Sequence, residues 1–104
     1  MSNDKSKSAL KGLPEMAGFV AAILKELSNE KRLLILCALI ENKGVSVAEL
    51  AEMVNLGQSA LSQHLARLRD QAIIDFRRDG ATIYYFIADE KIGRILKTLK
   101  SIYC

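Results

Sequence analysis

The stretch VSVAELAEMVNLGQSALSQHLARLRD, residues 45–70, decides the fold. Ser46 and Glu49 have the spacing of a capping box, so a short helix is expected to begin there and to run to about Val54. An Asn-Leu-Gly turn follows, and a second helix, QSALSQHLARLRDQ, starts at once at residue 58. Two short helices joined by a brief turn that contains glycine predict a helix-turn-helix unit.

The second of these helices has an apolar face and a polar face. Leu61, Leu65 and Leu68 recur at helical spacing and are expected to face inward. Near the helix start, the outer face carries four short polar side chains, Gln58, Ser59, Ser62 and Gln63. Amides and hydroxyls can exchange hydrogen bonds with base edges, so this face predicts a recognition helix in a DNA major groove. An ordinary solvated helix face is the alternative.

His64, the single histidine, falls nearer the leucine side of the same helix. We interpret it as a structural, partly buried histidine. A DNA contact or a metal ligand is the alternative for this residue.

A hairpin is predicted directly after this helix. The stretch AIIDFRRDGATIYYF contains two strand-like runs separated by Asp79 and Gly80, a strong signal for a two-residue turn. The pairs expected from that turn are Phe76 with Ile83 and Ile74 with Tyr85, which form one apolar face. The opposite face is expected to carry Asp75, Arg77, Thr82 and Tyr84.

Arg77 and Arg78 make the predicted hairpin basic, and the Gly80 tip makes it protrude. A ribbon of this kind is typical of a wing that contacts phosphates or a minor groove. A solvated arginine pair is the alternative, but the position directly after a candidate recognition helix favours the wing.

Upstream, Ser28 and Asn29 are N-cap candidates for a helix that carries the apolar run at residues 33–40. This helix is expected to stop before Gly44, a suitable C-terminal glycine, and to form the centre of the core.

Apolar helices are also predicted at both ends of the chain. Pro14 suits a first helical turn, and residues 15–27, EMAGFVAAILKEL, are apolar on nearly every face. Such a helix is expected to be buried all round, with one face in the core and the other against a second subunit.

At the other end of the chain, Asp89 is expected to cap a helix whose apolar stripe comprises Ile92, Ile95, Leu96, Leu99, Ile102 and Tyr103. The first and last helices together predict a helical dimer interface.

The chain has 104 residues, 50% of them hydrophobic, and a net charge of +3. This length predicts one small domain, at residues 14–104, for which dimerisation would add burial. Residues 1–13 are polar and lysine-bearing, so they are expected to form a flexible tail and not a signal peptide. The run at residues 33–40 is too short to span a bilayer, which predicts a cytoplasmic protein without a membrane partner.

Cytosolic thiols are normally reduced, so a transient sensing bridge is favoured over a structural disulfide for Cys37 and Cys104.

From about Leu24 to its end, the chain resembles the ArsR-type family of winged helix-turn-helix repressors. The resemblance is carried by LSNEKRLLILCALI, by QSALSQHLARLRD and by RRDG followed by YYF. Within that family, LILC in the second helix together with the terminal YC resembles the sulfur-responsive subgroup.

The resemblance implies a mainly α fold with a small β-hairpin, and a homodimer on an imperfect palindromic double-stranded DNA operator. It places Gln58, Ser59, Ser62 and Gln63 toward bases and Arg77 and Arg78 in the wing. It also implies that Cys37 and Cys104 are a redox pair. The reduced form is expected to repress, and a bridge induced by persulfide or polysulfide is expected to release the DNA. A metal-responsive repressor of the same family, or an antirepressor of virulence genes, is the alternative.

Departures from the family bear on these alternatives. Metal-sensing relatives carry Cys or His ligands where this chain has SVAELAEMV and DEKIGRILKTLK, so no metal and no cofactor are expected, although a site shared between subunits stays open. Gly57 stands where many relatives have a capping Ser, and glycine is tolerated at an N-cap.

A thiol peroxidase would need an activated cysteine or a Cys-x-x-Cys arrangement, and neither is visible, so no catalytic residue is expected. A small core residue is the alternative for Cys37.

Overall fold

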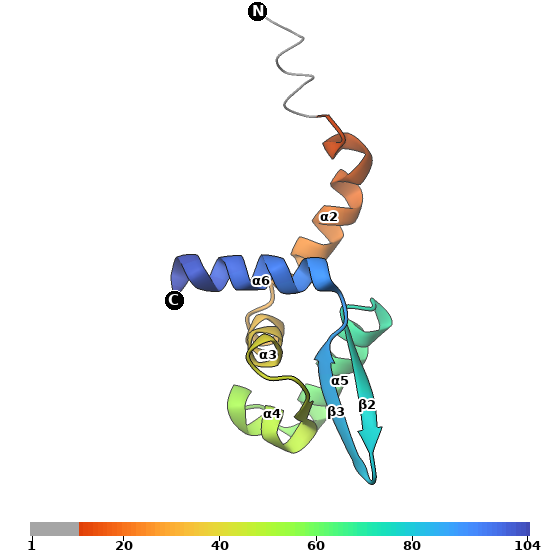
Figure 1. Cartoon of the computed structure of the whole chain (residues 1–104), viewed down its shortest axis with the longest axis vertical. Coiled ribbons are helices and arrows are strands. Elements are labelled where there is room, and N and C mark those ends of the chain that lie inside the picture. The colour runs from red at the N-terminus through yellow and green to blue at the C-terminus, as the bar shows by residue number, and fades with distance from the viewer. Residues whose placement is uncertain (1–10) are drawn as a thin grey trace, which may run out of the picture.

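The computed structural model of the protein describes residues 11–104 (Figure 1). The elements in chain order are α2 Leu13–Leu27, α3 Glu30–Glu41, β1 Val45–Ser46, α4 Val47–Val54, α5 Gln58–Asp70, β2 Ile74–Asp79, β3 Thr82–Ile87 and α6 Glu90–Tyr103. This order confirms the predicted mainly helical fold with a small β-hairpin. The expected tail at residues 1–13 lies largely outside the described residues, and α2 already begins at Leu13.

Helix α3 forms the centre of the core, as predicted. Asn29 caps it, accepting a 3.0 Å hydrogen bond from the Arg32 backbone N–H. Ile35 and Leu36 on this helix are fully buried, and Figure 1 shows α3 lying between α6 and α4. The core therefore assembles around the longest apolar run of the sequence.

The helix-turn-helix prediction is confirmed in detail. The Glu49 backbone N–H donates to the Ser46 hydroxyl, and the Ser46 backbone N–H donates to the Glu49 carboxylate, both at 3.2 Å. These reciprocal bonds form the predicted capping box of α4. On α5, the leucines expected to face inward, Leu61, Leu65 and Leu68, are at most 1% exposed. Their burial fixes which face of α5 looks outward.

The strand pairing differs from the prediction. The expected pairs, Phe76 with Ile83 and Ile74 with Tyr85, are wrong: Phe76 pairs with Tyr85 and Ile74 with Ile87. The loop consists of Gly80 and Ala81, because a tight hairpin of this kind needs a positive φ at its first loop position and Gly80 supplies it with φ 62°. The register shifts by two residues, so side chains still alternate as predicted and both faces keep their composition.

A third strand was not predicted. β1, Val45–Ser46, pairs antiparallel with β3, which gives the strand order β1-β3-β2. Two residues are too few to show the alternation that reveals a strand in a sequence. The strand ties the start of the helix-turn-helix unit to the hairpin.

The expectation that α2 is buried all round is wrong within the single chain. Only Glu26 and Leu27, at its C-terminal end, are buried, and Figure 1 shows the helix projecting away from the body. Its large apolar side chains are about half exposed: Leu13, Met16, Phe19 and Leu24. Because α2 meets the core only near its last turn, one chain offers the rest of its apolar surface nothing to pack against. The predicted contact with a second subunit stays a prediction.

Helix α6 is amphipathic, and its burial changes along its length. Asp89 caps it as predicted, accepting from the Lys91 and Ile92 backbone N–H groups. Ile92 and Leu96 are buried, whereas Ile102 is 65% and Tyr103 is 80% exposed. The C-terminal half of the apolar stripe therefore extends beyond the core of the single chain.

Candidate nucleic-acid interface and thiol pair

The four residues expected to contact bases lie together at the start of α5. Gln58, Ser59, Ser62 and Gln63 are all exposed on the first two turns of the helix. Gly57 occupies the N-cap, and because glycine has no side chain, no side-chain capping hydrogen bond forms there. This part of α5 offers amide and hydroxyl groups on a rigid helix held by three buried leucines.

The two wing arginines lie on opposite faces of the hairpin. Arg77 pairs with Tyr84 and Arg78 with Ile83, and neighbouring residues of a strand point to opposite sides. The Arg77 guanidinium lies 5.0 Å from the centre of the Tyr84 ring. It also lies so close to Gly44 that an added Cβ there would be 2.9 Å from the Arg77 Nη2 atom. Arg78 is exposed nearer the tip, so the predicted basic pair consists of two arginines in different surroundings.

A contact between α5 and the wing was missed by the sequence analysis. The Arg69 guanidinium lies 4.0 Å from the centre of the Phe76 ring, and its Nε is 3.4 Å from Asp75 Oδ1. Phe76 in turn packs edge-on against Tyr85, with ring centres 5.6 Å apart. These contacts fix the end of α5 relative to the hairpin that follows it.

A buried ion cluster links α2 to α5. The Glu26 carboxylate, on a residue that is only 4% exposed, accepts three hydrogen bonds of 2.8 to 3.1 Å from the Arg67 guanidinium. Arg32 Nε lies 3.3 Å from Glu26 Oε2 and donates to the Glu26 backbone oxygen at 3.1 Å. Hydrogen bonding to Arg67, opposed by burial, lowers the pKa of Glu26 to about 2. The three side chains, Glu26, Arg32 and Arg67, are called the Glu26 cluster below.

The sequence analysis missed the Glu26 cluster. The one available signal is a carboxylate near the end of an otherwise apolar helix, and its main partner, Arg67, lies 41 residues further along the chain. Spacing rules within a helix reveal partners three or four residues apart, so they cannot identify this one.

His64 lies partly buried beside this cluster, as its position near the leucines predicts. Burial lowers the pKa of its imidazole, and the positive charges of Arg32 and Arg67 lower it further. These surroundings favour the neutral ring.

The two thiols belong to α3 and to the residue that ends α6. Cys37 is half-buried on α3, and Cys104 is exposed directly after α6. Burial raises the pKa of the Cys37 thiol, the nearby Cys104 thiol raises it further, and Lys100 lowers it. Cys104 lines a hollow together with Ile40 and Glu41 of α3, which lie one helical turn from Cys37.

An ion pair runs beside the two thiols. Lys100 on α6 binds the Glu41 carboxylate on α3. Glu41 follows Cys37 by four residues and Lys100 precedes Cys104 by four, so each charged residue lies one helical turn from a cysteine. The ion pair thus joins the same two helices that carry the thiols.

Within residues 11–104, no three His, Cys, Asp or Glu side chains gather where they could hold a metal ion. In the same part of the chain, no helix is both long and apolar enough to cross a membrane.

Comparisons with known proteins agree with this architecture. The sequence profile described as "Bacterial regulatory protein, arsR family" matches residues 29–75. The chain is similar to the HTH-type transcriptional regulator YgaV of Escherichia coli, with 50% identity over 84 residues, covering 81% of this chain and 85% of YgaV. It is similar to the transcriptional activator HlyU of Vibrio cholerae, with 38% identity over 101 residues, covering 94% and 93%.

A solved structure shows the same fold. The crystal structure of the transcriptional repressor BigR from Xylella fastidiosa superimposes with a TM-score of 0.83 at 35% identity, covering 90% of this chain and 95% of that one.

Proposed function

The chain belongs to the arsR family of bacterial regulatory proteins, and from this premise we propose that it is a homodimeric repressor released from DNA by a Cys37–Cys104 bridge. Membership makes it a DNA-binding transcriptional regulator with a winged helix-turn-helix fold. The proposal goes further in three respects: the DNA contacts, the dimer and the sulfur signal.

For DNA binding, we propose that α5 enters a major groove and the wing contacts the backbone. Gln58, Ser59, Ser62 and Gln63 then contact base edges of one half-site. Arg77 and Arg78 supply positive charge to phosphates beside it. The exposure of all six side chains supports this assignment.

A dimer accounts for the exposed apolar surface of α2 and α6. Phe19 is 58% and Ile102 is 65% exposed, so most of the surface of both side chains is uncovered in the single chain. Large exposed apolar patches usually mark an interface. Two copies joined through these helices would present two α5 helices to an imperfect palindromic operator.

The proposed signal is a persulfide or polysulfide. One cysteine thiolate attacks a sulfane sulfur, a new S–S bond forms at the cysteine, and a shorter sulfide leaves. The second cysteine then attacks the first cysteine sulfur and displaces hydrosulfide. For hydrogen disulfide, the sum is two thiols plus H₂S₂ giving one Cys37–Cys104 disulfide and two H₂S. Both cysteines are oxidised and both sulfur atoms of the donor are reduced.

The placement of the two cysteines is the observation that supports this switch: Cys104 lines one hollow with Ile40 and Glu41, which lie one helical turn along α3 from Cys37. A bridge would tie α3 in the core to α6 in the proposed dimer interface, and would thereby shift the two recognition helices relative to each other. Allosteric coupling of about 1 to 3 kcal/mol is enough for release. The two free thiols, one on each helix, support the assignment.

Activation of transcription is an alternative to repression, because one relative is named a transcriptional activator. On that alternative, the protein displaces a silencer and so raises transcription. A metal-responsive repressor is the other alternative, and it predicts stoichiometric metal in the purified dimer, which elemental analysis measures.

The deciding experiment uses the variants Cys37→Ser and Cys104→Ser. Polysulfide should lower the operator affinity of the wild type about 5- to 150-fold and reversibly with reductant, as coupling of this size requires. Each variant should bind operator like the reduced wild type and ignore polysulfide. Intact-mass spectrometry should find an intramolecular bridge in the wild type alone. If either single variant keeps the full response, the two-thiol switch is wrong.

A further inference from the structure

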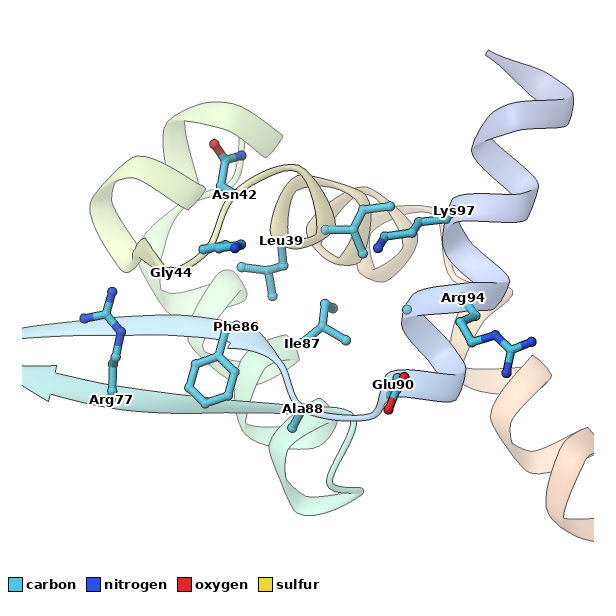
Figure 2. A pocket seen from close by; sticks show the side chains of 13 residues that line it. Leu39, Asn42, Gly44, Arg77, Phe86, Ile87, Ala88, Glu90, Arg94 and Lys97 are labelled. Carbon is cyan, nitrogen blue, oxygen red and sulfur yellow. The ribbon is translucent and has the colours of Figure 1, made fainter.

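A groove separates the C-terminal end of α3 from β3 and the first turns of α6. Its volume is about 620 Å³, and Figure 2 shows Leu39 and Ile87 facing the space between these elements. Ile40 and Ala88 add to its apolar lining. This volume lies in the range of small-molecule sites, which are mostly apolar with a few placed polar groups.

The charged residues around the groove are mainly cations. The positively charged side chains are Lys43, Arg77, Arg94 and Lys97, against the single carboxylate of Glu90. Within residues 11–104, none of the four cations takes part in a salt bridge. In Figure 2, the Lys97 amine points from α6 toward the groove, whereas Arg94 points away from it. Lys97 is therefore the cation best placed to meet an anion above the apolar lining.

Gly93 keeps the groove open at its α6 wall. Glycine is unfavourable in a helix interior relative to alanine, so its presence there calls for a reason. Close packing is not the reason for the glycine, because a Cβ added at Gly93 would lie 3.7 Å from the Ile87 Cγ2 atom, an ordinary van der Waals contact. A longer side chain at this position would occupy the groove.

We propose that this groove binds a small amphipathic organic anion, with its apolar body on Ile40 and Ile87, above the buried Leu39, and its acidic group at Lys97. The apolar lining, the unpaired cations and the missing side chain at Gly93 point to the same class of ligand. The groove adjoins the hollow beside Cys104, because Ile40 and Lys97 line both. The inference does not rest on the sulfur switch, since it is tested on the reduced protein.

The occupant would lie where it can influence DNA binding. The groove is bordered by β3, which pairs with the strand that carries Arg77 and Arg78, and by α6. A ligand that prefers one arrangement of these elements would shift operator affinity by the 5- to 150-fold that is typical of coupled sites.

The test is a titration of the reduced full-length protein, followed by methyl NMR signals of Leu39 and Ile87. Decanoate should shift both signals in a saturable way, and acetate, which lacks the apolar body, should not. Decanol has the same body without the charge and should bind about tenfold more weakly. Naphthoate in a parallel titration distinguishes an aromatic from an aliphatic body.

Two variants and a matched control make the test specific. Lys97→Gln should lower decanoate affinity about tenfold and leave decanol binding unchanged, which a loss of fold would not do. Gly93→Leu should abolish both. Ala48→Leu, at an exposed position of α4 outside the groove and outside the proposed dimer interface, should bind like the wild type. Equal affinities for decanoate and decanol, absent shifts at Leu39 and Ile87, or full binding by a folded Gly93→Leu variant would each overturn the proposal.

Discussion

Helices α5 and α2 both carry large apolar side chains, which are buried on α5 and about half exposed on α2. On α5, Leu61, Leu65 and Leu68 are at most 1% exposed, whereas on α2 Phe19 is 58% and Leu24 is 51% exposed. Helix α5 packs against α4 and the wing, while α2 touches the body only near its C-terminal end. Burial is therefore set by the neighbours that an element finds, and the apolar surface left on α2 shows where a further neighbour fits.

The Glu26 cluster joins α2 to α5, so the largest loss of stability is expected when its carboxylate is removed. Glu26→Ala would leave Arg32, which is 9% exposed, and half-exposed Arg67 without their carboxylate. Removing one member of a buried ion pair is costly, and solvation of Arg67 places the loss near the lower end, at about 3 kcal/mol. Chemical denaturation measures it. Glu15→Ala, at the exposed start of the same helix, should cost about 0.5 kcal/mol or less.

The pH dependence of the unfolding free energy tests the same cluster in a second way. The pKa of Glu26 falls from 4.5 to about 2 on folding, so its contribution is complete above pH 4.5 and is lost as the pH falls toward 2. The difference in unfolding free energy between wild type and Glu26→Ala should therefore shrink over this window. A difference that stays constant from pH 5 to pH 2.5 would show that the carboxylate charge is not what stabilises the contact.

The next largest effect is expected on the exposed, polar face of α5. Gln63→Ala should weaken binding to the cognate operator by about 1 to 3 kcal/mol, because one base contact is lost. Binding to random DNA, which depends on charge, should change much less. Fluorescence anisotropy with both DNAs measures the difference, and equal losses on the two would remove Gln63 from the base contacts.

The smallest effect concerns the wing. Arg78→Ala should weaken binding to all sequences and reduce the slope of log affinity against log salt by about one unit. Lys91→Ala, an equal change in charge at the exposed start of α6, should leave the slope unchanged. An unaltered slope for Arg78→Ala would show that this arginine does not contact phosphate.

The outcome of the hairpin prediction shows how far local patterns reach. The Asp-Gly signal located the turn, and alternation assigned both faces correctly, but the pairing was wrong by two residues. Alternation has a period of two, so it cannot distinguish registers that differ by two. The φ of Gly80 decided between them, because the loop needs the left-handed conformation at its first position.

The elements that could be predicted from the amino-acid sequence are those whose signals are local. The capping box at Ser46 and Glu49, the buried leucines of α5 and the Asp89 cap each depend on residues within a few positions of one another. The remaining contacts depend on residues that are far apart in the sequence and meet only in the folded chain. The bond from Glu26 to Arg67 spans 41 residues, and the groove around Leu39, Ile87 and Lys97 combines three elements. Such contacts depend on how the elements pack together, and no local period in the sequence encodes that packing.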